Sequence, residues 1–183
     1  MANQRLTDKT ALDNHTGSGD LYMIVDVSDT TGSAAGTSKK LDSKFVIMTD
    51  KISVSNAELQ AMDGTGGAGN FKTLVSAPGS GYMIIPLTIT ILTTYASSTE
   101  TSAKSMYVGY EKDQTTRSWT NFSRIMNGVA TSSTYQGRGA VTNATGVLDA
   151  SIDNQAFYLW SNGNFNGGWS CDVYITYQIV KIT

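Results

Sequence analysis

The longest apolar run of the chain, residues 79–95, constrains the fold more than any other stretch. Ile, Thr and Tyr dominate this run, and their side chains suit the pleated surface of a sheet. From Leu87 onward apolar and polar residues nearly alternate, which places Leu87, Ile89 and Ile91 on one face of a strand and the intervening threonines on the other. We therefore expect a long core strand whose second face is only partly buried.

Two features near the start of this run bear on its geometry. Pro86 has no backbone N–H to donate to a neighbouring strand, so it indicates a bend, a bulge or an edge position. The sequence Ala77-Pro-Gly-Ser-Gly81, just before the strand, is a strong turn signal. The strand is therefore expected to follow a tight turn and to contain one irregularity.

Shorter β-like segments follow one another along the rest of the chain, separated by turns rich in Gly, Asn and Ser. Ser55 and Glu58 form a capping-box pattern, which predicts one short helix at 56–62 after a hinge-like join at 48–53. Residues 119–125 fit either a strand or a loop. Strands are predicted at 21–25, 39–47, 52–55, 71–75, 106–110, 133–141, 155–161 and 170–182.

Strands at short intervals with almost no helix indicate an all-β fold, a jelly-roll-like β-sandwich preceded by a small amino-terminal β-hairpin module. We assign residues 1–50 to an amino-terminal arm and hairpin module and residues 51–183 to the sandwich head. The small-residue loop at 28–38 is long for a compact domain, so it is either mobile or held by a partner. The sandwich core is expected to contain Leu87, Ile89, Ile91, Phe157, Leu159, Val173, Ile175 and Tyr177.

Composition excludes several classes of protein. The net charge is −2 and no block of basic residues occurs, so nucleic acid and anionic lipid are not expected partners. The first residues are polar, without the apolar core of a secretion signal, and no apolar run is long enough for a membrane helix. The single cysteine, Cys171, excludes an internal disulfide and is expected to be a small core residue. These features indicate a soluble protein made in the cytoplasm, without membrane insertion.

Residues that carry catalysis are scarce. His15, the one histidine, lies in the polar arm, away from any nucleophile pattern. The glycine cluster at 63–69 is followed by a strand rather than by Gly-Lys-Ser/Thr and a helix, so it is interpreted as a turn and not as a phosphate loop. Acidic pairs such as Glu111 and Asp113 are interpreted as solvated turns, and residues 26–32 lack the spacing of a calcium loop. We predict no catalytic residue, cofactor or metal site, and the protein is not expected to be an enzyme.

Aromatic residues near the later loops and strand ends allow one binding hypothesis. Flat rings beside Asn and Gln are a common way to stack on sugar faces, whereas core and subunit packing is the alternative that we favour. Trp160, inside a predicted strand, is assigned to the core. The glycan hypothesis requires at least two exposed neighbouring rings among Trp119, Tyr135, Phe165 and Trp169.

Several segments resemble the fibre and decoration proteins of tailed bacteriophages. Residues 10–12, 20–32 and 36–40 are similar to the amino-terminal module of these proteins, with an apolar strand ending in Val-Asp, a Ser/Thr/Gly loop and a Gly-Thr-x-Lys-Lys return strand. Residues 52–62, 74–85 and 173–177 resemble a β-sandwich module of phage virion proteins, in which a short helix precedes a Leu-Val-x-Ala-Pro-Gly-x-Gly turn. The likeness does not extend over residues 96–150.

The resemblance implies a component of the virion, and specifically a head fibre or decoration protein on the capsid surface. In such proteins the amino-terminal part attaches to capsid or tail proteins, the sandwich projects outward and the assembly is usually a homotrimer. The alternative is a tail-fibre or adhesin head that binds a host receptor or surface glycan. Virion attachment or oligomerisation is assigned to Leu21, Tyr22, Ile24, Val25, Lys39, Lys40 and Phe45.

Overall fold

The fold is described from a computed structural model of the chain. It describes residues 21–26, 28–29, 31, 37–42, 46–63, 70–110, 118–137 and 152–182. Contacts between Cα atoms divide the chain into two compact units, Met1–Met48 and Thr49–Thr183. The roles of attachment module and head that the sequence suggests for the two parts stay predictions.

The first unit contains a β-hairpin. Strand β1, Leu21–Asp26, pairs antiparallel with β2, Thr37–Asp42, so that residue 21 lies opposite 42 and residue 26 opposite 37. Beside the hairpin, the carboxylate of Asp29 accepts hydrogen bonds from the backbone N–H and hydroxyl of Thr31, at 3.1 and 2.6 Å, and pairs with the ammonium of Lys39 at 2.9 Å. Strand β2 corresponds to the strand predicted at 39–47 and begins two residues earlier than predicted. Residues 43–45 of the predicted strand lie outside the described residues.

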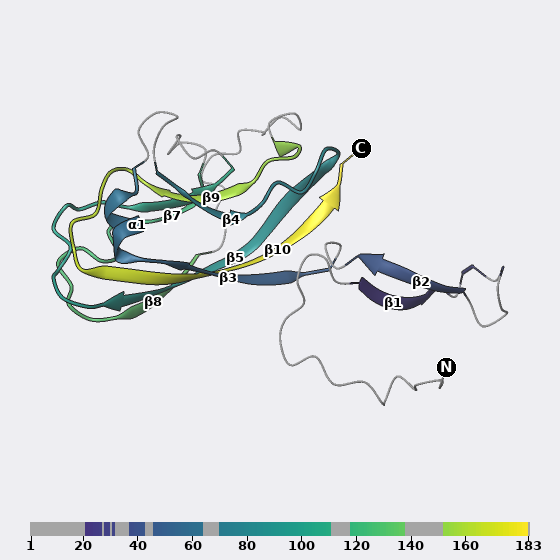
Figure 1. The fold of residues 1–183 in the computed structure, drawn as a ribbon, viewed down its shortest axis with the longest axis horizontal. Coiled ribbons are helices and arrows are strands. Elements are labelled where there is room, and N and C mark those ends of the chain that lie inside the picture. Colours follow the sequence, from purple (N-terminus) through teal and green to yellow (C-terminus); the bar gives the residue numbers. More distant parts are fainter. Residues whose placement is uncertain are drawn as a thin grey trace. The chain divides into compact units, whose positions relative to one another are not determined.

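Two four-stranded antiparallel sheets form the rest of the described chain, stacked face to face (Figure 1). The larger sheet has the order β3-β10-β5-β8 and the smaller sheet the order β4-β9-β6-β7. This confirms the predicted all-β sandwich. The strands are β3 Met48–Val54, β4 Lys72–Val75, β5 Tyr82–Tyr95, β6 Met106–Gly109, β7 Ser118–Phe122, β8 Ser133–Gly137, β9 Phe157–Ser161 and β10 Trp169–Lys181.

The strand order bears on the jelly-roll prediction. Most connections cross between the sheets, so consecutive strands such as β3 and β4, or β9 and β10, lie in opposite layers. When the eight strands are lettered B to I in chain order, the sheets are B-I-D-G and C-H-E-F. We interpret this order as jelly-roll-like, because two interleaved Greek keys over eight strands characterise that fold.

Strands β5 and β10 form the centre of the larger sheet. Their pairing runs from Tyr95 opposite Trp169 to Tyr82 opposite Lys181, and it shifts register between Thr176 and Tyr177. At this shift Tyr177 lies opposite Pro86 and Thr176 opposite Thr88, which leaves the residue between them without a partner on β10. Pro86 therefore marks a bulge, one of the three possibilities that its missing N–H allowed.

The bulge corrects one predicted core position. Leu87 is the extra residue, and 37% of its surface is exposed, whereas Pro86 is buried in its place. Strict alternation failed here because one added residue reverses the side-chain direction along a strand. The other predicted core residues are buried as expected: Ile89, Ile91, Phe157, Leu159, Val173, Ile175 and Tyr177.

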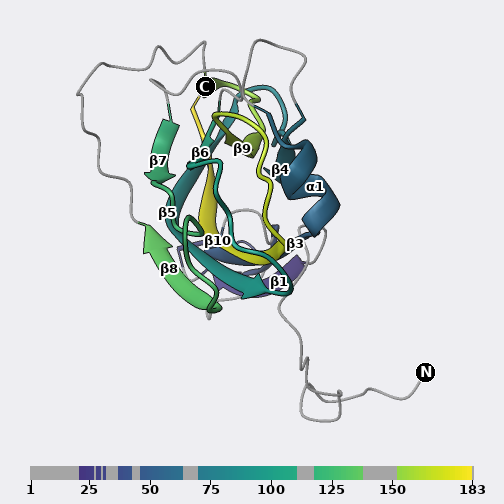
Figure 2. The ribbon, with the colours of Figure 1, turned by 90° about the vertical axis from the view of Figure 1, so that its left-hand side faces the viewer.

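One short helix lies at an open side of the sandwich. Helix α1, Asn56–Ala61, begins with the predicted capping box: Ser55 and Glu58 each bind the other's backbone N–H. Figure 2 shows α1 on the side of β3 and β4, with β7 and β8 on the opposite side. Leu59 of α1 is fully buried, so the helix contributes to the core. The hinge-like join predicted at 48–53 is wrong, because this segment forms most of strand β3.

The core explanation predicts a clear difference between two apolar substitutions. Ile175→Ala removes a fully buried side chain and should lower the free energy of unfolding by about 2–5 kcal/mol. Val129→Ala, at a side chain that is 38% exposed, should cost about 1 kcal/mol or less. Urea unfolding followed by tryptophan fluorescence checks both, and equal losses would contradict the assignment of the core.

Candidate functional site

Glu100 is the most heavily bonded polar side chain among the loops at one end of the sandwich. It is 1% exposed. Its Oε1 accepts hydrogen bonds from the backbone N–H and the hydroxyl of Ser102, and its Oε2 accepts from the N–H groups of Asn166 and Gly167, both at 2.8 Å. Its carbonyl oxygen accepts from the N–H of Gly128 at 2.8 Å. Glu100 thus joins three loops, which precede β6, β8 and β10.

The surroundings of Glu100 determine its chemistry. Burial alone would raise the pKa of this carboxyl, but the donors of Ser102, Gly167 and Asn166 lower the pKa by more, so it lies below its ordinary value. A carboxylate whose oxygens are occupied by backbone donors has no free position for a substrate. We therefore interpret Glu100 as a structural anchor rather than as a catalytic acid or base. The sequence analysis missed it, because its loop has no motif.

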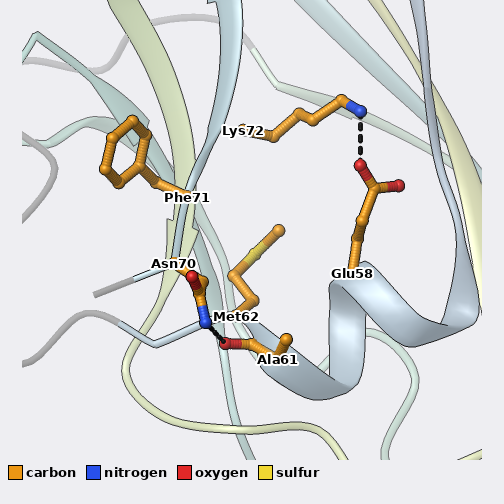
Figure 3. A pocket seen from close by; sticks show the side chains of 6 residues that line it. All are labelled: Glu58, Ala61, Met62, Asn70, Phe71 and Lys72. Carbon is orange, nitrogen blue, oxygen red and sulfur yellow. Dashed lines mark hydrogen bonds and ion pairs between the residues drawn. The ribbon is translucent and has the colours of Figure 1, made fainter. Parts of the chain in front are cut away.

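A small hollow lies between α1 and the start of β4 (Figure 3). Its volume is about 200 Å³, below the roughly 300–1,000 Å³ of drug-sized ligand pockets. The ammonium of Lys72 pairs with Oε1 of Glu58 at 2.6 Å, and the amide of Asn70 donates to the carbonyl of Ala61 at 3.0 Å. The hollow is lined by Glu58, Ala61, Met62, Asn70, Phe71 and Lys72.

The hollow is suited to binding rather than to proton transfer. The hydrogen bond from Lys72, followed by those from Ser55, lowers the pKa of Glu58 to about 2. At neutral pH Glu58 is therefore a carboxylate. An aromatic ring, an amide and an ion pair together offer a flat apolar face beside hydrogen-bonding groups.

The outward face of the larger sheet has a polar half. The Asp172 carboxylate accepts from the hydroxyl of Ser53 at 2.6 Å and pairs with Lys51 at 2.9 Å. Ser53 and then Lys51 hold the pKa of Asp172 below its usual range. Thr49 and Thr176 join their hydroxyls at 2.9 Å. Because these side chains are polar and pair across the strands, this half of the face can lie in contact with water.

The other half of the same face is mostly apolar, with Gln178, opposite Ile85, as a polar member. At the bulge, the exposed side chain of Leu87 lies on this outward face. Between the bulge and the start of β5, the outward face also carries three half-buried apolar side chains, those of Met83, Ile85 and Val180. Strand β8 pairs with β5 only over residues 89–93, so within the described part of the chain no strand lies beside residues 82–88 on that side. We call the set Met83, Ile85, Leu87 and Val180 the apolar patch.

The predicted attachment residues are placed only in part. Leu21, Tyr22, Ile24 and Val25 lie in β1, and Lys39 and Lys40 in β2, with residue 24 opposite 39 in the hairpin. The Lys39 side chain is exposed and forms the ion pair with Asp29. Phe45 lies outside the described residues. The assignment of this set to attachment stays a prediction.

The structure corrects two of the predicted glycan-contact residues. Phe165 and Trp169 are 5% and 1% exposed, so neither presents a ring face to a ligand. Trp119 and Tyr135 are half-buried. Trp119 packs edge-on against Phe157 with ring centroids 6.2 Å apart, and the Tyr135 hydroxyl donates to the carbonyl of Ile125 at 2.7 Å. The four residues therefore do not form one exposed platform.

Three further aromatic rings at the smaller sheet, those of Phe71, Tyr107 and Tyr158, were not singled out by the sequence analysis, whereas Trp160 is fully buried as predicted. Phe71, 36% exposed, meets Tyr158 edge-on with centroids 5.1 Å apart. Tyr107 stacks on Trp160 at 6.0 Å. Their position becomes evident only from the register of β9 against β4 and β6, in which residue 158 lies opposite 73 and residue 160 opposite 107.

The described part of the chain contains no candidate metal site and no candidate membrane-spanning helix. No group of three or more His, Cys, Asp and Glu side chains there is arranged to hold a metal ion. Across the same residues, no helix has the length and apolar character needed to cross a membrane.

Cys171 is 3% exposed, as predicted for a core residue. Burial, followed by the charge of Asp172, raises the pKa of its thiol to about 12.

Comparison with known proteins gives only weak structural similarity. No protein-family model matches the chain, and no curated protein does. Among solved structures, a chain of the cyanophage Pam1 capsid asymmetric unit aligns over 97% of this chain and 98% of its own length, with 16% sequence identity and a TM-score of 0.36. A similarity at that level is too low to establish a shared fold, so the functional argument below rests on this chain's own residues.

The ion pair of Glu58 predicts a specific dependence on pH. Its pKa is lowered from 4.5 to about 2 in the fold, so its stabilising contribution is present above pH 4.5 and is lost as the pH falls to about 2. Glu58→Gln retains a side chain that fits the capping box but removes the charge. Thermal unfolding at several pH values should show a smaller decrease across this window in the variant, whereas an unchanged pH profile would contradict the assignment.

Proposed function

We propose that this chain is a non-enzymatic structural protein of a bacteriophage virion, a capsid-surface fibre or decoration protein. Residues 1–50 attach it to capsid or tail proteins, and residues 51–183 project as a homotrimeric head. The sequence resemblance of both parts to phage fibre and decoration proteins supports the assignment. The apolar patch is the structural observation that carries it, because an assembly surface is what such a protein requires.

The patch supports assembly for a physical reason. The outward face of an antiparallel sheet is normally polar where it meets water, as the Asp172 half of this sheet is. The other half instead presents four apolar side chains on β5 and β10, next to the part of β5 that extends past its pairing with β8 among the described residues. Burial between identical chains would remove both the apolar area and the open edge from water. In a trimer each copy would present this face to the next, a head-to-tail contact that a three-fold rotation closes.

The trimer proposal predicts that one charge at the patch disrupts assembly. Leu87→Lys should convert a trimer to monomers, as measured by light scattering of the purified chain, because the ammonium would have to lose its water in an apolar contact. Thr94→Lys is the matched control, since Thr94 is exposed near the other end of the same strand. A wild-type monomer, or a trimer that survives Leu87→Lys, would overturn this interface.

The attachment proposal predicts that the first unit binds the particle. Full-length protein should co-sediment with phage particles that lack it, whereas a chain beginning at Val46, which keeps the whole of strand β3, should remain in the supernatant. Circular dichroism of the shortened chain shows whether the sandwich stays folded. Equal sedimentation of the two folded chains would place attachment in the sandwich instead.

A receptor- or glycan-binding head is the second candidate, and the hollow beside Phe71 is the observation that favours it. Phe71 offers a partly exposed ring, and Asn70, Lys72 and Glu58 place polar groups around a volume of about 200 Å³, which suits one sugar unit rather than a long chain. Phe71→Ala should abolish binding on an array of bacterial surface glycans, and Val129→Ala should not. Absence of any binding by the wild-type protein would remove this candidate.

A further inference from the structure

Three Asn-Gly pairs, which are the sequences most prone to spontaneous deamidation, all lie at the Glu100 end of the sandwich. They are Asn127-Gly128, Asn162-Gly163 and Asn166-Gly167, and the sequence contains no others. In each pair the glycine lacks a Cβ that would hinder attack on the asparagine side chain. The hydrogen bonds around the three pairs differ, however, and so should their reactivity.

Deamidation has two requirements. The glycine nitrogen gives up its proton and attacks the asparagine Cγ; an N–Cγ bond forms, the Cγ–Nδ2 bond breaks, and ammonia leaves with that proton. Water then opens the resulting succinimide ring to aspartate or isoaspartate. The reaction therefore slows when the glycine N–H is made less acidic, or when the carboxamide is held away from the glycine nitrogen.

The Asn166-Gly167 pair is restrained on both counts. The Gly167 N–H donates to the Glu100 carboxylate at 2.8 Å, so losing its proton would place two negative charges side by side. The Asn166 carboxamide is held at two points by Thr101: Oδ1 accepts from its backbone N–H at 3.0 Å, and Nδ2 donates to its hydroxyl at 2.9 Å. Gly167 itself is buried.

The Asn162-Gly163 pair is the least restrained. The Gly163 N–H meets only the neutral hydroxyl of Ser161, at 3.3 Å. The Asn162 side chain accepts one hydrogen bond, from the N–H of Ser105 at 2.9 Å, and the residue is exposed. The Asn162 backbone N–H also donates to the Ser105 carbonyl at 3.3 Å, but the carboxamide itself is held at one point only and no negative charge accepts from the Gly163 N–H.

The Asn127-Gly128 pair is intermediate between these two. The Gly128 N–H donates at 2.8 Å to a neutral acceptor, the carbonyl of Glu100. The Asn127 carboxamide accepts one hydrogen bond, from the N–H of Ala103 at 3.1 Å. This pair shares its anchor residue with Asn166 but not the contact with the carboxylate.

We propose that Asn162 is the site of spontaneous deamidation in the folded chain, and that the Glu100 carboxylate protects Asn166, only four residues away, from the same reaction. Glu100 thereby has a second role besides joining loops. Both sites lie in the connection between β9 and β10, where isoaspartate would lengthen the backbone of a tight turn.

The wild-type protein alone tests the order of reactivity. Samples are aged at mildly alkaline pH, and peptide mapping by mass spectrometry follows the mass gain at each asparagine. In the folded chain Asn162 should react first and Asn166 last, whereas in urea the three should react at similar rates. If Asn166 reacts as fast as Asn162 in the folded chain, the proposal is wrong.

A substitution isolates the contribution of the charge. In Glu100→Gln the rate of deamidation at Asn166, measured relative to that at Asn162 in the same molecule, should rise about tenfold. This is the effect expected when the pKa of the Gly167 N–H falls by about one unit. Thr101→Val is the matched variant, because it removes the hydroxyl partner but leaves the carboxylate, and it should give a smaller rise. A uniform increase at all three sites would indicate general loosening and would contradict protection by charge, as would no change at Asn166.

Discussion

The pairing of β5 with β10 is the interaction on which the rest of the sandwich depends. These two strands are the longest among the described residues and lie at the centre of the larger sheet, between β3 and β8. Their inward side chains, including Ile89, Ile91, Val173 and Ile175, are fully buried. Since residues 82–95 meet residues 169–181, the fold cannot be completed before nearly the whole chain is available. A topology with contacts so distant in sequence is expected to fold slowly.

Prediction from the sequence succeeded where a single interaction between residues close in sequence determines the local structure. Ser55 and Glu58 predicted the helix start, because a capping box needs only residues three apart. Alternation identified the core faces of β5 and β10, because burial on one side imposes a period of two. Pro86 likewise signalled an irregularity that the pairing shows to be a bulge.

The failures have a common physical cause, which is contact between segments distant in sequence. The exposure of Leu87 depends on where β10 shifts register, and nothing near Leu87 encodes that shift. Phe165 and Trp169 are buried, and Trp169 meets the ring of Tyr95, from the distant strand β5, edge-on with ring centroids 5.2 Å apart. Glu100 carried no signal, because its partners at 166 and 167 are more than sixty residues away. The positions of Phe71, Tyr107 and Tyr158 at the smaller sheet could not be predicted for the same reason.

The bulge at Pro86 also affects the behaviour of many copies of this chain at once. Residues 82–88 of β5 have no described strand on one side, and an open strand of this kind can template the addition of a strand from another molecule. A proline without an N–H, followed by an extra residue that twists the strand, interrupts the regular ladder that such templating needs. The irregularity that exposes Leu87 therefore opposes the pairing of a further backbone strand with this part of β5. The bulge therefore limits the open-ended growth of fibrils by strand addition at this part of β5.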